Sequence, residues 1–172
     1  MIFAVEPLKD CWQEAMTLAE EHWQETESYR HGQKFLPMFE RYAPYDDSGW
    51  FFVATGRDDG HLVGYAGMYV TPSMHTQQII ATEDTWFLLP EYRKGRNAIE
   101  FCKFVEAECR ARGAVEICMT AKLGNGAGRI LEYLGYDMVS KQYSKSLGSA
   151  DSAIHQPVTE KSDVRAVTTR ST

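Results

Sequence analysis

The stretch that decides the fold is Ile79–Gly113, IIATEDTWFLLPEYRKGRNAIEFCKFVEAECRARG. Its first part, Ile79–Leu89, predicts a strand because β-branched and aromatic residues cluster there ahead of a proline. Asn97–Arg112 predicts a helix, since its apolar residues recur at helical spacing and Gly113 suits the position just past a helix end. A basic turn, RKGR, joins the two. A helix that begins after such a turn offers free backbone N–H groups and the positive end of its dipole, which predict an anion site.

This stretch resembles the acyl-CoA-binding motif of the GNAT superfamily of N-acyltransferases, in which a strand ending in Val-x-Pro-x-x-Arg leads into an Arg/Gln-x-x-Gly-x-Gly/Ala loop and a helix. The loop here is Arg93-Lys94-Gly95-Arg96-Asn97-Ala98. Arg93 and Ala98 match the pattern, whereas Arg96 stands in place of the central glycine and Gly95 comes one position early. That glycine lets the backbone approach the pyrophosphate closely, but Arg96 can add charge-assisted hydrogen bonds to a CoA phosphate. The turn is most similar to that of GNAT proteins from tailed phages and prophages.

The resemblance covers roughly Trp50 to Leu147 and implies an α/β (α+β) GNAT fold. Its central mixed, mostly antiparallel sheet is flanked by helices and splayed between the fourth and fifth strands. We expect residues 1–147 to form this domain. Residues 148–172 are Ser/Thr-rich without apolar periodicity, which is typical of a flexible C-terminal tail or of a segment that orders on a partner.

Apolar periodicity and turn residues predict the other elements. Strands are expected at Ile2–Val5, Trp50–Thr55, Leu62–Val70, Ala114–Thr120 and Tyr136–Leu147. Helices are expected from a cap at Asp10 to about Glu25, around Pro37–Tyr42, and at Arg129–Leu134.

Composition narrows the function classes. The 172 residues carry 24 acidic and 18 basic side chains, a net charge of -6 that argues against general binding of nucleic acid. The four cysteines lack paired metal-type spacing, so we interpret them as free thiols in a reducing cytosol, with no metal site. The first residues, MIFAVEPLKDCW, lack a basic segment followed by a long apolar run, which indicates neither secretion nor membrane insertion. We expect a cytoplasmic protein, in a phage-infected or prophage-bearing bacterial host if the phage resemblance holds.

The resemblance implies acetyl-CoA as the cofactor. Backbone groups of Trp86, Phe87 and Leu88 are expected to bind its pantetheine arm as a pseudo-strand, and the Arg93–Ala98 turn its diphosphate. Asn125, which resembles the family's asparagine before the last helix, and Arg129 complete the expected cofactor site.

Transfer of the acetyl group requires that the acceptor amine be neutral, so a protonated amine must first lose its proton to a base. The resemblance places an acid on the strand that ends near Pro90, so Asp84 is the first candidate and Glu83 the second. Strict alternation puts Asp84 on the face of Trp86, with Glu83 opposite, unless a bulge intervenes. Carboxylates that are only solvated or ion-paired remain the alternative for each.

The sequence offers several possibilities for the proton donor to the departing thiolate. Many GNAT enzymes use a tyrosine on the last helix, at the position that is Leu131 here. Tyr133 or Tyr143 can substitute, or the thiolate can leave unaided because of its modest basicity.

The segment Tyr29–Gly49 varies with substrate in the GNAT family and forms a wall of the acceptor pocket. Its candidate lining residues are Tyr29, His31, Phe35, Phe39, Tyr42 and Tyr45. His75, from a later loop, is a further candidate acceptor-binding residue. The alternatives are that the aromatic residues of this segment close the core and that His75 is a solvated loop histidine. We interpret His22 as a surface or capping histidine.

These observations predict an acetyl-CoA-dependent N-acetyltransferase that acts on a primary amine of a small molecule or a protein, with a homodimer as one expected state. A catalytically weak interaction or anti-defence protein that keeps the fold is the first alternative. A modifier of an amine-bearing nucleobase is the second.

Overall fold

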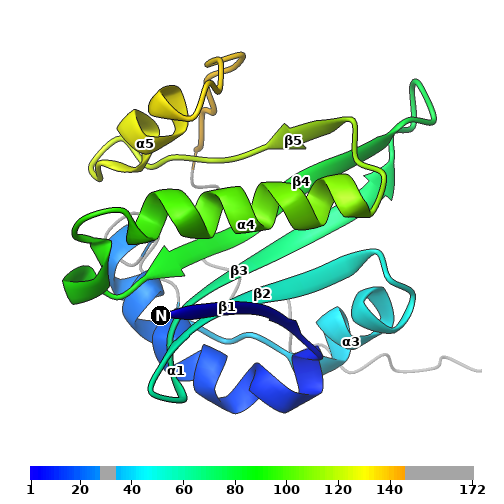
Figure 1. The fold of residues 1–172 in the computed structure, drawn as a ribbon. Helices are drawn as coiled ribbons and strands as arrows, with labels where there is room; N and C mark the ends of the chain where they lie inside the picture. Colours follow the sequence, from blue (N-terminus) through cyan, green and yellow to red (C-terminus); the bar gives the residue numbers. More distant parts are fainter. Residues whose placement is uncertain (28–33, 146–172) are drawn as a thin grey trace, which may run out of the picture. The chain divides into compact units, whose positions relative to one another are not determined.

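The computed structural model describes residues 1–27 and 34–145, which contain a five-stranded sheet (Figure 1). The strands follow one another in sequence order, and the first four are antiparallel while the fifth runs parallel to the fourth. They are β1 (Ile2–Glu6), β2 (Phe51–Asp58), β3 (His61–Pro72), β4 (Ile79–Leu88) and β5 (Glu116–Cys118). The predicted mixed, mostly antiparallel sheet is thus confirmed.

Helices cover both faces of the sheet. They are α1 (Leu8–Thr26), α3 (Phe39–Asp47), α4 (Asn97–Ala111) and α5 (Ala127–Tyr133), with a short 3-10 turn, η1 (Pro90–Arg93), between β4 and α4. Figure 1 shows α4 lying along one face, and α1 with α3 on the other. None of the described helices is both long and apolar enough to cross a membrane.

Alternation along β2 divides the core in two. Phe51 points into the core under α1, and its neighbour Phe52 points into the core under α4. The α1 core includes Tyr65 and Phe87, and the α4 core includes Phe101. A sheet with both faces apolar needs helices on both sides, which explains the layered arrangement.

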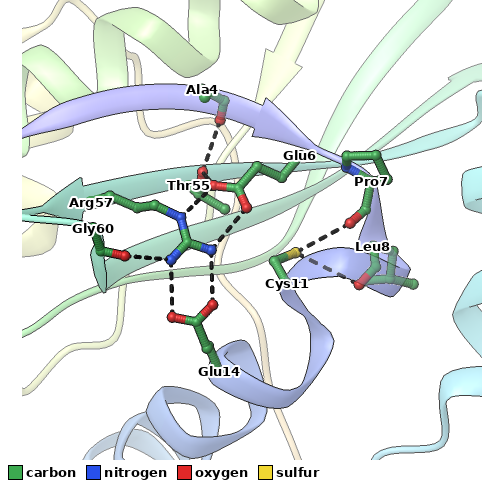
Figure 2. Close-up of polar contacts among 9 residues, drawn as sticks. All are labelled: Ala4, Glu6, Pro7, Leu8, Cys11, Glu14, Thr55, Arg57 and Gly60. Atoms are coloured by element: carbon green, nitrogen blue, oxygen red, sulfur yellow. Dashed lines mark hydrogen bonds and ion pairs between the residues drawn. The ribbon is translucent and has the colours of Figure 1, made fainter.

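An ionic network fixes α1 to the edge of the sheet. Arg57 of β2 lies between two carboxylates, with its Nε 2.7 Å from Glu6 Oε1 and its Nη1 2.9 Å from Glu14 Oε2 (Figure 2). Thr55 adds a hydrogen bond of 2.6 Å to Glu6 Oε1. The bond from Arg57 holds the pKa of Glu6 below its ordinary value. One guanidinium therefore joins β1, β2 and α1.

Several predicted element ends are shifted. Pro7 rather than Asp10 occupies the position before α1, and Asp10 lies in its first turn. The predicted short helix near Pro37 is α3, which begins at Phe39 and continues past Pro44 to Asp47. Pro44 has no backbone N–H to donate, and α3 ends three residues later.

The predicted final strand is wrong over its described residues, because 136–145 form no strand. Met138 and Val139 are exposed, and β5, the last strand of the described sheet, is only three residues long. Residues 1–141 form one compact unit and 142–172 a second, of which 142–145 are described. The predicted boundary after residue 147 falls outside the described residues and stays a prediction.

All four cysteines are free. Cys11, Cys102 and Cys109 are buried, and Cys118 is exposed at the end of β5. No group of three or more His, Cys, Asp or Glu side chains in the described part of the chain is placed to hold a metal ion.

Candidate active site

The sheet opens between β4 and β5. The two strands pair only where Ile80–Thr82 faces Glu116–Cys118. Beyond Thr82, β4 continues to Leu88 paired only with β3 among the described strands. Backbone groups along this edge of β4 are therefore available to a ligand in extended conformation.

A β-bulge interrupts β4 at this opening. Gly67 of β3 faces Thr85 and the next residue, Met68, faces Glu83, which leaves Asp84 as the extra residue. The bulge that our sequence analysis kept as an alternative is therefore present, and strict alternation does not place Asp84 on the face of Trp86. The bulge reverses the alternation, so that Glu83 lies on the α4 side and Asp84 on the side of α1 and α3.

Asp84 lies beside a tyrosine and has no cationic partner among the described residues. Tyr42 of α3 donates a hydrogen bond from Oη to Asp84 Oδ2 at 3.2 Å. No described lysine, arginine or histidine forms an ion pair with this carboxylate. Surrounding protein atoms desolvate it and raise its pKa, while the bond from Tyr42 acts in the opposite direction. The Asp84 side chain is exposed, so the raised pKa strengthens it as a proton acceptor while leaving it accessible to an amine.

The turn into α4 leaves a helix start without a cap. Gly95 adopts a φ of +69°, a left-handed conformation that favours glycine, and Arg96 follows it at the capping position. No side chain caps the first turn of α4, so its N–H groups lack a side-chain acceptor among the described residues. Asn97 Nδ2 instead donates to the Tyr92 carbonyl at 3.1 Å, which fixes the turn.

Comparison with known proteins gives the family. Residues 11–136 match the Acetyltransferase (GNAT) family. The chain belongs to this family. GNAT acetyltransferases use acetyl-CoA, which is therefore the cofactor. No curated protein matches the sequence significantly.

Solved structures share the GNAT fold with this chain. Ribosomal-protein-alanine N-acetyltransferase from Brucella melitensis biovar Abortus 2308 superposes with a TM-score of 0.67 at 19% identity, covering 86% of this chain and 98% of that one. An aminoglycoside acetyltransferase from an uncultured soil metagenomic sample, in complex with sisomicin, has a TM-score of 0.65 at 11% identity, with 86% and 95% covered. Aminoglycoside N-acetyltransferase AAC(6')-Iy, in complex with CoA, has a TM-score of 0.63 at 12% identity, with 86% and 100% covered.

The residues present fit the GNAT cofactor. Beside the open edge of β4, the indole Nε1 of Trp86 is buried and lacks a hydrogen-bond partner among the described residues. The uncapped start of α4 adds backbone donors and a positive dipole end, and Lys94 and Arg96 are exposed near it. The amides of the CoA pantetheine arm suit the open edge of β4, and the CoA diphosphate suits the start of α4.

Arg93 is already engaged within the protein. Its Nε donates to the Leu88 carbonyl at 2.6 Å, and its two terminal nitrogens pair with both oxygens of Glu25, at 2.9 and 2.7 Å. The guanidinium also lies 5.1 Å from the ring centroid of Phe87. The structure therefore shows Arg93 joining the end of α1 to the end of β4. Its predicted contact with the diphosphate stays a prediction.

Glu83 lies at the opening between β4 and β5 rather than on the α1 side of the sheet. Its Oε2 accepts a hydrogen bond of 3.1 Å from the Thr120 amide, just after β5. Desolvation raises its pKa, and the bond from Thr120 partly offsets that effect. The carboxylate thus holds the chain after β5 near β4.

His22 is a site residue that our sequence analysis missed. Its Nδ1 lies 3.1 Å from Tyr65 Oη and 3.2 Å from Thr85 Oγ1, next to the bulge. The ring stacks on Phe87 at 4.8 Å, and desolvation lowers its pKa to about 4. The interpretation as a surface histidine is therefore wrong. Its spacing from Ala15 and Leu18, which are buried on the same stripe of α1, was the available signal.

The remaining predicted residues are spread over the domain. Leu131 is buried at the position where many GNAT enzymes have their tyrosine, and Tyr133 is 72% exposed. Asn125 Oδ1 accepts a hydrogen bond from the Ala127 amide at 3.2 Å and so supports the start of α5, on which Arg129 is exposed. Tyr143 belongs to the second unit.

Among the predicted acceptor residues, Tyr42 and Tyr45 lie on α3, whereas His75 lies in a loop. His75 is exposed in the loop between β3 and β4, at the far end of β4 from Leu88, and its amide bonds to Ser73 Oγ. Tyr29 and His31 lie outside the described residues.

Proposed function

We propose that this GNAT acetyltransferase transfers an acetyl group from acetyl-CoA to a primary amine at the β4 bulge, with Asp84 as the base. The observation that carries the proposal is the position of Asp84, which occupies the extra residue of the bulge at the point where β4 parts from β5. Bound acetyl-CoA supplies the acetyl group as a thioester. Structures with this fold include acetyltransferases named for a ribosomal protein and for aminoglycosides, so the fold accommodates amines of both proteins and small molecules.

The backbone of β4 and the α4 turn hold the cofactor in this proposal. Backbone groups of Trp86, Phe87 and Leu88 that face the open edge bind the pantetheine amides, apart from the Leu88 carbonyl, which accepts from Arg93. Residues 93–98 receive the diphosphate at the helix start. Asn125 supports the α5 turn and Arg129 adds a positive charge on that helix. These contacts fix the thioester near the bulge, which leaves the acceptor to approach from the α1 and α3 side.

Asp84 then receives the proton of the incoming ammonium. An amine attacks a carbonyl only through its lone pair, so the proton must leave before or during attack. Each unit by which the pKa of the carboxylate rises brings this transfer about 1.4 kcal/mol closer to balance. The bond from Tyr42 Oη orients the carboxylate, and water carries the proton onward.

The departing thiolate needs no tyrosine in this proposal. The family's tyrosine position is the buried Leu131, and a thiolate is a weak enough base to leave unprotonated. Tyr133 and Tyr143 remain predicted donors, and each is tested by its phenylalanine variant.

Release of free thiol from acetyl-CoA in the presence of a panel of primary amines tests the function. We expect turnover that is lost by a factor of about 100 or more in Asp84→Asn, as is typical for removal of a general base. Glu83→Gln, one residue away on the other face of β4, is the matched control and should keep most of the activity. Equal rates for wild type and Asp84→Asn would remove Asp84 from the mechanism.

An interaction protein that binds CoA without turnover is the second candidate. The engagement of Arg93 by Glu25 and the buried Leu131 favour it. Tight binding of CoA without thiol release on any amine would support this candidate. Action on a nucleobase is disfavoured by the net charge of -6. A phage origin, a cytoplasmic location and a homodimer stay predictions.

A further inference from the structure

A cleft opens between α3 and β3, on the same side of the sheet as Asp84. It has a volume of about 400 Å³ and is lined by Arg41, Tyr42, Tyr45 and Tyr69. This volume lies in the range of pockets that bind small molecules.

The tyrosine wall of the cleft is held by further aromatic packing. Tyr45 and Tyr69 meet edge to face, with ring centroids 5.4 Å apart. Phe51 packs behind them, 4.9 Å from Tyr69 and 5.5 Å from Tyr42. Trp12 of α1 supports Tyr42 at 5.9 Å. Rings packed in this way present a fixed surface of faces and edges to a ligand.

Asp84 supplies a negative charge beside this wall. It is bonded to Tyr42, and its charge contributes to the raised pKa of both Tyr42 and Tyr69, after desolvation as the main cause. The negative charge of Asp84 therefore acts on two of the three tyrosines that line the cleft. No described cation neutralises it, so a ligand with an ammonium group complements this position.

Arg41 supplies a positive charge to the same cleft. It precedes Tyr42 on α3 and lies one helical turn before Tyr45. Its side chain is exposed, and no described carboxylate lies within ion-pair distance of it. A ligand that carries only positive charges is repelled here, whereas one with an anionic group is attracted.

We propose that the cleft binds the acceptor and selects a primary amine that also carries a carboxylate. The amine lies toward Asp84, the body of the molecule packs on Tyr42, Tyr45 and Tyr69, and the carboxylate pairs with Arg41. This inference rests on the proposed function, because it takes the amine at Asp84 to be the acetyl acceptor. Acceptors with several positive charges are disfavoured by the same arrangement.

Matched acceptors that differ only in the carboxylate test the proposal. The first pair is 4-(aminomethyl)benzoate and 4-(aminomethyl)benzamide, and the second is Nα-acetyl-lysine and its C-terminal amide. Each pair keeps one reactive primary amine and one skeleton. We expect kcat/KM from thiol release to favour the carboxylate member of each pair by roughly fivefold or more. Equal values for both members overturn the proposal.

Removal of the positive charge of Arg41 tests whether the cleft causes the preference for acceptors that carry a carboxylate. Arg41→Gln should abolish the preference by raising KM for the carboxylate members alone. Arg110→Gln removes the same charge from an exposed position on α4, on the other face of the sheet, and should leave the preference intact. A preference that survives in Arg41→Gln overturns the assignment of the cleft.

Direct binding separates this inference from the proposed function. Isothermal titration calorimetry of each of the four acceptors into the CoA-bound protein measures acceptor affinity without turnover. Preferential binding that depends on Arg41, without thiol release, would support the cleft and refute the transferase. Equal binding of acid and amide, or binding of neither at millimolar concentration, would refute the cleft even if other amines were acetylated.

Discussion

Tyr42 Oη donates a hydrogen bond of 3.2 Å to Asp84 Oδ2, and so joins α3 to the extra residue of the β4 bulge. The bond connects an element that lines the cleft to the proposed base. It stabilises the charged form of the carboxylate, because a hydroxyl donates most strongly to an anion. Tyr42, which lines the proposed acceptor cleft, thus helps to set the pKa of Asp84.

Removal of this bond should change the pH profile. In Tyr42→Phe the carboxylate loses a group that lowers its pKa, so the pKa of Asp84 rises. Because the base must be unprotonated, we expect the acidic limb of kcat/KM to move to higher pH. Tyr45→Phe removes a neighbouring hydroxyl that has no described bond to Asp84, and its acidic limb should stay in place. An unchanged limb in Tyr42→Phe would show that Asp84 does not control that limb.

His22 should make stability depend on pH. Its folded-state pKa is about 4, below its ordinary value of 6.5. Between these values the unfolded chain binds a proton that the folded chain does not, so stability falls as the pH drops from 6.5 towards 4. The loss should reach about 3 kcal/mol. Urea unfolding at a series of pH values measures it.

The control for His22 is another histidine of the same chain. His22→Gln should remove most of this pH dependence, while also lowering stability at neutral pH because the bonds to Tyr65 and Thr85 are lost. His75→Gln changes an exposed loop histidine and should preserve the dependence. Identical pH dependence in wild type and His22→Gln would mean that His22 is not held neutral.

Arg93 and Glu25 provide a test of how the turn binds CoA. We expect Arg93→Ala to weaken CoA binding by about 1–3 kcal/mol. If Arg93 acts by holding α1 to the end of β4, Glu25→Gln should weaken binding in the same direction. If Arg93 contacts the diphosphate directly, Glu25→Gln frees the guanidinium and affinity is kept or increased. Calorimetric Kd values for the two variants distinguish these roles, and an unchanged Kd in both would exclude each of them.

Arg57 should be important for stability and not for activity. Arg57→Ala leaves Glu6 and Glu14 without their partner, and we expect a loss of about 1.5–3 kcal/mol in the free energy of unfolding. The pKa of Glu6 is lowered in the folded state, so this contribution is present at neutral pH and is lost as the pH falls below about 4.5. Chemical unfolding measures it, with Arg110→Ala as the exposed control. Equal stability of both variants would contradict the role of the network.

The strong local patterns of the sequence were reliable guides. The strand and helix on either side of the RKGR turn are β4 and α4, since each is specified by its own periodicity and bounded by Pro90 and Gly113. The expected strand Tyr136–Leu147 is absent over its described residues, because a strand also needs an edge to pair with, and β5 provides only three residues. Local composition does not contain that information.

The site was harder to predict than the fold. The bulge at Asp84 is a property of the register between β3 and β4, and alternation within one strand could not reveal it. The position of Arg93 depends on Glu25, which lies far away in sequence. His22, in contrast, was visible as a polar residue on the buried stripe of α1.

The inserted residue in β4 makes the chain length of this segment more critical than its composition. Deleting Glu83, Asp84 or Thr85 would restore regular pairing with β3. One residue would then remain on each face between Thr82 and Trp86, which is one fewer on the α1 side than the bulge provides. A substitution at these positions changes one functional group, but a deletion would remove either Asp84 or Thr85 from the α1 side of β4. Related chains that keep this chemistry should therefore vary in residue type here while preserving the spacing.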